Sequence, residues 1–150
     1  MTSKASEPRL IIPALEPFYE TVRPLSWLIV RIAAGSILFV HGWLKVPRGP
    51  ASFAGAYESL GFYPGAAWAW SSTIVELSAG ICITLGLFTR FFAAAAAIEM
   101  AIITTLYLNN GFSWLGRGYE FTLMWGLICF AIALRGGGPY SLDRKLGVQL

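Results

Sequence analysis

The sequence predicts an all-α, polytopic membrane protein: a bundle of four transmembrane helices with an interfacial helix in the first loop. Hydrophobic residues make up 56% of the 150 residues and charged residues only 13%, about half the share of a typical soluble domain. Long apolar runs alternate with loops that contain proline and glycine. Six tryptophans and six tyrosines fit the aromatic belts of two membrane interfaces.

The predicted spans end where polar or helix-breaking residues begin, and they cover residues 25–44, 68–88, 91–108 and 119–134. At 1.5 Å per residue, a run of this length reaches about 30 Å, the thickness of the hydrocarbon layer. The alanine run Ala93–Ala97 allows a close approach between helices in the third span. The fourth span is short and ends at Arg135-Gly-Gly-Gly-Pro.

The segments between and beyond the spans are predicted as tails, a loop and turns. Residues 1–24 are broken by prolines and form a tail with a short surface helix near 14–22. The loop 45–67 holds the interfacial helix within 51–60. Thr89-Arg90 is expected to form a very tight turn. Residues 135–150 form a second tail, so that 25–134 is the membrane domain.

The distribution of lysine and arginine predicts the orientation of the chain. An even number of spans puts both termini on one side, together with the turn at Arg90. That side carries the larger share of the basic residues: Lys4, Arg9, Arg23, Arg90, Arg135, Arg144 and Lys145, against Lys45, Arg48 and Arg117 on the other. The positive-inside rule then predicts cytoplasmic termini in a multi-pass protein of the cell's inner membrane.

Several function classes have little support in the composition. The net charge of +3 comes from scattered residues, which gives no basic patch for nucleic acid. Cys82 and Cys129 are isolated, so neither a disulfide framework nor a structural zinc site is indicated. His41 is the single histidine, which excludes bis-histidine haem ligation within one chain and disfavours a metal site. No cofactor site is visible within the chain.

Ionisable residues within or at the rims of the apolar runs are the most informative feature of the sequence. They are Arg31, His41, Glu76, Glu99 and Glu120, with Lys45 just beyond the first run. A charge at mid-bilayer costs about 2.5–3.5 kcal/mol on insertion scales. Such residues face a bundle interior, pair with one another or line a pathway. We therefore predict that these six residues form a polar pocket inside the bundle.

Helical rise and rotation predict how these groups are placed. His41, Glu76 and Glu120 fall in the outer half of the membrane, with Lys45 just above them. Glu99 lies near the centre and Arg31 toward the cytoplasm, within reach of Glu76 or Glu99. The basic groups come from the first span and the acids from the other three. This complementarity predicts that the groups converge.

Structural alternatives remain open for each of these residues. An ion pair involving Arg31 can simply fix the register of the helices. Glu99 can be present as a neutral, protonated carboxyl group, and His41 can be a hydrogen-bonded or interfacial residue without a chemical role. Both cysteines are more typical of small core residues than of redox centres.

Several motifs, taken in order, resemble the DoxX family of small four-helix membrane proteins. They are Phe39-Val40-His41-Gly42 with Lys45, Glu76-Leu-Ser-Ala-Gly80, Gly118-Tyr119-Glu120 and Gly137-Gly138-Pro139-Tyr140, and the similarity covers about residues 25–143. The resemblance implies a four-helix bundle with cytoplasmic termini. It also implies a link to membrane redox chemistry, because relatives are associated with a terminal quinol oxidase, with thiosulfate:quinone oxidoreduction and with thiol-redox stress complexes.

The leading functional hypothesis is a non-haem subunit of a quinone-linked or redox-stress complex, an accessory subunit of a quinone-dependent oxidoreductase. Arg31, His41 and Lys45 would donate hydrogen bonds to a quinone headgroup, and Glu76 and Glu120 would accept or carry protons. A redox protein would then be the partner in the bilayer, and a homo-oligomer is a further expectation. The alternatives are a scaffold subunit without chemistry and, third, a small transporter or proton pathway.

Overall fold

The computed structural model describes residues 10–150, and every regular element in this part of the chain is helical. The α-helices are α1 (Glu16–Lys45), α2 (Ala54–Glu58), α3 (Gly65–Leu85), α4 (Thr89–Tyr107), α5 (Glu120–Arg135) and α6 (Leu142–Leu146). Short 3-10 turns lie at Pro13–Leu15, Pro50–Phe53, Leu108–Asn110 and Trp114–Gly116. The predicted all-α class is confirmed.

Within residues 10–150, three helical stretches are long and apolar enough to cross a membrane: Pro13–Lys45, Gly65–Leu85 and Thr89–Asn110. They contain the first and third predicted spans, 25–44 and 91–108, and most of the second, 68–88, whose last three residues lie in the turn after α3. The fourth prediction, residues 119–134, corresponds to α5, which has 16 residues. At 1.5 Å per residue α5 extends about 24 Å, which is shorter than the hydrocarbon layer.

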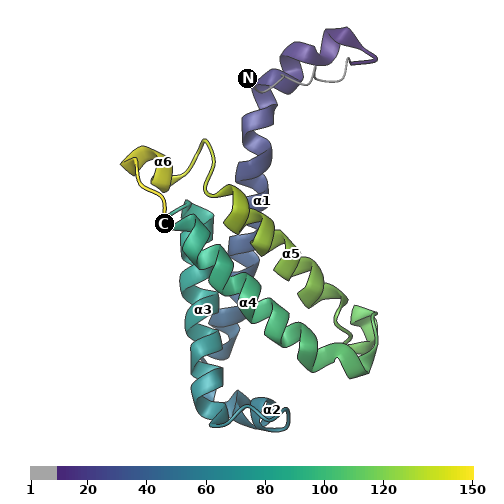
Figure 1. The fold of residues 1–150 in the computed structure, drawn as a ribbon, viewed down its shortest axis with the longest axis vertical. Helices are drawn as coiled ribbons and strands as arrows, with labels where there is room; N and C mark the ends of the chain where they lie inside the picture. The colour runs from purple at the N-terminus through teal and green to yellow at the C-terminus, as the bar shows by residue number, and fades with distance from the viewer. Residues whose placement is uncertain (1–9) are drawn as a thin grey trace, which may run out of the picture.

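Helix α1 begins earlier than the sequence analysis expected. Instead of a short helix ending at Val22, one continuous helix runs from Glu16 through Pro24 to Lys45. Pro17 stands at the start of the helix, where its missing N–H costs nothing. Within the helix Pro24 removes one backbone hydrogen bond. The purple N-terminal part of α1 leans away from the rest and projects beyond the other helices (Figure 1).

The turn between α3 and α4 lies slightly before the predicted Thr89-Arg90. Gly86 ends α3 in the left-handed conformation at φ 72°, and Phe88 follows at φ 46°. Leu87 N donates to Cys82 O at 2.9 Å, which satisfies a carbonyl at the end of α3. Thr89 and Arg90 are therefore the first residues of α4 rather than the turn itself.

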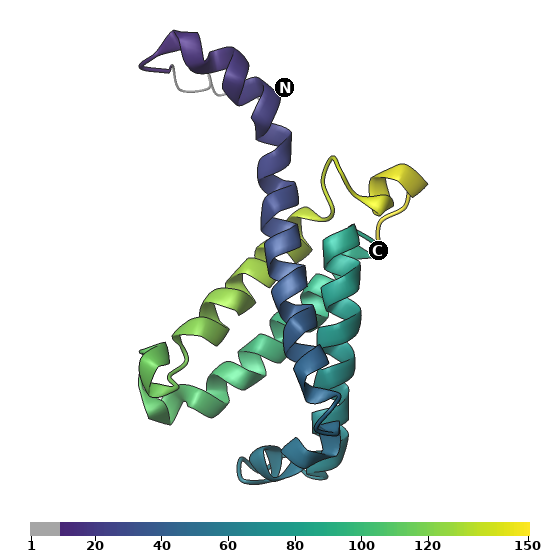
Figure 2. The same ribbon diagram turned by 180° about the vertical axis from the view of Figure 1, so that it is seen from behind.

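The long helices form two antiparallel pairs. Helices α1 and α3 lie side by side, and α4 runs along α5 (Figures 1 and 2). Between α1 and α3 the spacing is set by glycine: a Cβ on Gly80 would lie 2.6 Å from Phe39 Cα, and one on Gly35 would lie 2.7 Å from Gly80 O. In α4, Ala93 and Ala96 are fully buried, which confirms the close approach predicted from the alanine run.

The two pairs meet at one end of the molecule and diverge toward the other. Near α6 the ends of α3, α4 and α5 lie close together, whereas the α4–α5 connection stands away from α2 at the opposite end (Figure 2). We refer to these as the α6 end and the α2 end. Helix α2 and the preceding 3-10 turn pack on the start of α3, where Gly65 N donates to Glu58 Oε1 at 3.1 Å. The short helix expected within 51–60 is present there.

Candidate functional site: a polar-headed cavity between the helix pairs

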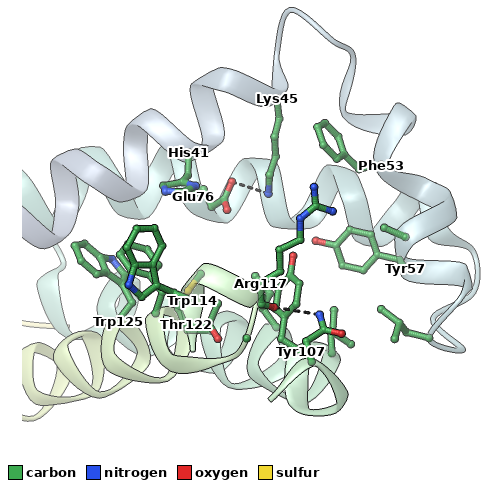
Figure 3. A pocket seen from close by; sticks show the side chains of 18 of the residues that line it. His41, Lys45, Phe53, Tyr57, Glu76, Tyr107, Trp114, Arg117, Thr122 and Trp125 are labelled. Atoms are coloured by element: carbon green, nitrogen blue, oxygen red, sulfur yellow. Dashed lines mark hydrogen bonds and ion pairs between the residues drawn. The ribbon is translucent and has the colours of Figure 1, made fainter. Parts of the chain in front are cut away.

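A cavity of about 780 Å³ lies between the helix pairs, toward the α2 end. Its walls include apolar side chains of α1 and α4, and aromatic side chains of α2, α5 and the α4–α5 connection. Figure 3 shows the polar groups at one wall and the aromatic groups opposite them. Three of the six predicted pocket residues line this cavity: His41, Lys45 and Glu76.

Lys45 and Glu76 form an ion pair in the cavity wall. Lys45 Nζ lies 2.7 Å from Glu76 Oε2 and donates a hydrogen bond to Ser72 Oγ at 2.8 Å. The exposed fraction is 4% for the Glu76 side chain and 19% for that of Lys45. Gly42 makes this approach possible, because a Cβ there would lie 2.9 Å from Glu76 Cβ. The predicted meeting of a basic first span and an acidic second span is confirmed for this pair.

His41 is the first of three neighbouring aromatic rings that bridge α1 and α5, and its ring is tilted by 39° against that of Phe121. Its ring centroid lies 6.3 Å from that of Phe121, which in turn stacks on Trp125 at 5.3 Å. The three rings line the cavity, and His41 itself is exposed at the wall. The single histidine is therefore accessible and lies on the same wall as the Lys45–Glu76 pair (Figure 3).

Glu99 is buried next to this group rather than in the cavity lining. Both of its carboxyl oxygens are buried, and neither forms a hydrogen bond with a residue within 10–150. Glu76, Ser72 and Lys45 are the groups that act on it electrostatically. Its neighbour Met100 and Ile103, one turn further along α4, line the cavity. Glu99 thus forms part of the polar cluster but lacks the predicted cationic partner.

Tyr57 of α2 closes the cavity at the α2 end. It is half-buried, and burial raises the pKa of its phenol above the usual value, while Ser72 and Lys45 act in the opposite direction. The hydroxyl group therefore stays protonated at neutral pH and can donate a hydrogen bond. Figure 3 shows the ring directed into the cavity from the helix that follows Phe53.

Arg31 lies at the α6 end and not in the cavity, which corrects the expected pairing with Glu76 or Glu99. Its side chain is 1% exposed and donates hydrogen bonds to the backbone carbonyl groups of Gly137 and Tyr140. Gly86 leaves room for the guanidinium group, since a Cβ there would lie 2.5 Å from Arg31 Nη1. The buried charge is therefore stabilised by the segment between α5 and α6.

Asp143 of α6 lies close enough to Arg31 to act on it electrostatically, and it caps α4. Its carboxylate accepts hydrogen bonds from Phe88 N at 2.6 Å, Thr89 N at 2.9 Å and Thr89 Oγ1 at 2.6 Å. A carboxylate at a helix N-terminus satisfies free N–H groups and is favoured by the helix dipole. The segment after α5 is thus bound to the bundle through buried charges.

Glu120 also has a local structural contact. It is the first residue of α5, and its Oε2 accepts a hydrogen bond from Trp114 N at 3.2 Å. This contact orders the connection that carries Trp114 and Arg117, both of which line the cavity. Glu120 therefore lies behind the cavity wall instead of in it.

The structure adds site residues that sequence reasoning missed. Ser72, Tyr57, Arg117 and Trp125 are all part of the cavity or its polar wall. Ser72 shares a helical face with Glu76, which is a usable signal in the sequence. No local sequence pattern predicts that Tyr57 or Arg117 lines the cavity. Their positions depend on how the α1–α3 and α4–α5 connections fold against the helices.

The arrangement combines hydrogen-bond donors, a carboxylate and aromatic rings on otherwise apolar walls. Such a cavity suits a small amphipathic molecule whose polar head reaches the Lys45–Glu76 pair. Within residues 10–150 no group of three or more potential metal-binding side chains is found. Cys82 and Cys129 are free thiols, and neither lines the cavity.

Fold and cavity together define a helical membrane protein with a polar cavity between two helix pairs. Comparison with family models identifies its family: residues 26–109 match the DoxX model, so the chain belongs to the DoxX family. Residues 70–149 also match the model of the TQO small subunit DoxD, the small subunit of thiosulfate:quinone oxidoreductase. The resemblance noted in the sequence motifs is thereby confirmed.

One relative has a comparable length, and its description names no function. It is an uncharacterised protein of Haemophilus influenzae, 27% identical over 130 residues that cover 84% of this chain and 94% of the relative. No solved structure matches the chain.

Proposed function

We propose that the protein is an integral membrane subunit of a quinone-linked redox complex and that its cavity binds a quinone headgroup. The observation that carries the proposal is the Lys45–Glu76 ion pair beside His41 in the wall of a cavity of about 780 Å³ with apolar and aromatic sides. The carbonyl oxygens of a quinone headgroup accept hydrogen bonds, and its ring is apolar. This combination of donors and apolar contact surface therefore suits it. Membership in the DoxX family and the match to the DoxD model support a role in such a complex.

The roles of the side chains follow from their positions. Lys45 Nζ and the His41 ring would donate hydrogen bonds to a carbonyl oxygen of the headgroup, and the Tyr57 hydroxyl group provides a further donor. Reduction of a quinone to a quinol takes two electrons and two protons. Glu76 and His41 can hold and pass protons. The electrons would come from a redox protein bound to this subunit.

The membrane topology is part of the same proposal. We place α5 as a fourth, short span that tilts little or thins the bilayer locally. The bundle then has four transmembrane helices, α2 lies at the outer interface, and both termini lie in the cytoplasm of a cell with the protein in its inner membrane. The excess of lysine and arginine on the side of the termini supports this orientation. The cavity accordingly opens in the outer half of the membrane.

A scaffold subunit without chemistry is the second candidate, and the α6 end favours it. There the buried charges of Arg31 and Asp143 bind backbone groups and the Thr89 hydroxyl group, which is a purely structural use. Under this alternative the Lys45–Glu76 pair would likewise serve only to fix α1 against α3. The two candidates differ in whether the cavity binds a ligand.

Binding of a quinone analogue to purified protein tests the proposal. Quenching of tryptophan fluorescence is a suitable signal, because Trp114 and Trp125 line the cavity. We expect His41→Ala to weaken binding about tenfold, as the loss of a hydrogen bond to a polar headgroup does. Ser36→Ala is the matched control, since this exposed residue of α1 does not line the cavity. Equal affinity in both variants, or no binding to the wild-type protein, would exclude the proposal.

A further inference from the structure

Arg117 introduces a positive charge at the cavity, and no acidic side chain within residues 10–150 forms a salt bridge with it. It lies in the connection between α4 and α5, where it adopts the left-handed conformation at φ 58°. Its backbone carbonyl accepts a hydrogen bond from Asn110 Nδ2 at 3.1 Å, which holds the connection in place. The guanidinium group extends toward Tyr57 and Lys45 (Figure 3).

Glu99 is buried behind the cavity wall and does not line the cavity, and three other acidic residues near this end of the molecule have partners of their own. Glu76 is paired with Lys45, Glu120 binds Trp114 N, and Glu58 binds Gly65 N. The Arg117 side chain makes neither a salt bridge nor a hydrogen bond with residues 10–150. Among the residues that line the cavity, the opposite charges of Lys45 and Glu76 cancel each other. The charge of Arg117 therefore leaves the lining with a net positive charge.

The surroundings of Arg117 favour an anion attached to an apolar body. Tyr57 and Tyr107 offer hydroxyl groups, while Leu60, Leu106 and Trp114 provide apolar contact surface in the same cavity. A guanidinium group binds planar and tetrahedral oxyanions through two parallel hydrogen bonds.

We propose that the cavity binds an anionic amphiphile, with the acidic group at Arg117 and the apolar body along α1 and α4. This inference rests on the proposed function and deepens it: the quinone-type ligand carries a negative charge at the end that faces Arg117. The same anionic chemistry could come from a phospholipid headgroup, so the test includes both sources.

Two naphthoquinones of similar shape, one anionic and one neutral, test the effect of a negative charge on the ligand. 2-Hydroxy-1,4-naphthoquinone is an anion at neutral pH, and 2-methoxy-1,4-naphthoquinone is its neutral counterpart. We expect the wild-type protein in neutral detergent to bind the anion about tenfold more tightly, as expected for one charge-assisted hydrogen bond. Arg117→Gln should weaken binding of the anion more than binding of the methoxy compound and so abolish this preference. Arg117→Lys should retain part of the preference, because it keeps the charge but not the bidentate geometry.

The control variant is Arg48→Gln, which removes an exposed arginine of the preceding loop that does not line the cavity. It should bind both compounds as the wild-type protein does. Equal binding of the two compounds by the wild-type protein, or a preference that survives Arg117→Gln, would overturn the inference.

A second experiment with phospholipids distinguishes a failure of this inference from a failure of the proposed function. Phosphatidylglycerol and phosphatidylcholine are compared in mixed micelles by native mass spectrometry. If neither naphthoquinone binds but phosphatidylglycerol binds in an Arg117-dependent manner, the quinone proposal fails and the anionic site stands. If neither lipid nor naphthoquinone shows dependence on Arg117, the anionic site is refuted.

Discussion

Lys45 Nζ and Glu76 Oε2 lie 2.7 Å apart and join α1 to α3 at the wall of the cavity. The pair comes from two helices that glycine residues hold in close contact. It therefore combines two properties: it fixes the packing of these helices, and it presents a charged group to whatever enters the cavity. The two properties can be separated by mutation.

Removal of one partner of this pair should be more damaging than removal of both. Lys45→Met leaves the largely buried Glu76 carboxylate without its cation, and we expect a loss of about 3 kcal/mol in the free energy of unfolding. The double variant Lys45→Met/Glu76→Leu should recover most of this loss. Thermal unfolding in detergent measures both. If the double variant is as unstable as the sum of the single variants, the pair makes no coupled contribution.

Removal of the Asp143 carboxylate should destabilise the α6 end. Asp143→Ala leaves Phe88 N and the buried Thr89 N without their acceptor, at an expected cost of about 2 kcal/mol. The segment after α5 should then be cleaved more rapidly by added protease. Arg144→Ala, an exposed neighbour, is the control and should behave as the wild-type protein does. Unchanged protease resistance of Asp143→Ala would contradict this role.

Gly80→Ala should force α1 and α3 apart. The added Cβ would lie 2.6 Å from Phe39 Cα, and because backbone atoms cannot yield like a flexible side chain, we expect a loss of about 1–3 kcal/mol. Gly55→Ala is the matched control, since a Cβ there has no heavy atom within 4 Å. Comparable unfolding temperatures for the two variants would show that α1 and α3 are not packed as described.

Topology can be tested with single cysteines in a Cys82→Ala/Cys129→Ala background. With α5 as a fourth span, a membrane-impermeant maleimide added to intact spheroplasts should label Arg48→Cys and spare Val148→Cys. Permeabilised spheroplasts should show labelling of both. If Val148→Cys is labelled in intact spheroplasts, α5 does not return the chain to the cytoplasm.

The sequence predicted the helices well because apolar runs and their breaks are local signals. The expected spans 25–44, 68–88 and 91–108 fall within or close to the observed α1, α3 and α4. The errors arose where tertiary contacts decide. Pro24 was read as the end of a tail, yet α1 continues through it, and Gly86 rather than Thr89-Arg90 forms the turn.

The candidate site was predictable only in part, because the predicted depth of an ionisable side chain in the membrane does not specify which group it binds. His41 and Glu76 were predicted to lie in the outer half of the membrane with Lys45 just above them, and the three side chains line one cavity. Arg31 was expected to pair with an acid across the bundle, but the backbone carbonyl groups of Gly137 and Tyr140 bind it instead. These carbonyl groups belong to residues 135–150, which were predicted to form a tail. No periodic pattern in the sequence predicts that this segment folds back onto the bundle.

The most direct test of the central claim is to locate the ligand by photolabelling. An azido-quinone bound to the purified protein is photolysed, and the labelled peptides are identified by mass spectrometry. The account predicts labels in residues 53–60 and 114–125, which line the cavity at α2 and around the start of α5, and their loss when an unlabelled quinone competes. Competed labelling confined to the α6 end or to lipid-facing residues of α4 would contradict it.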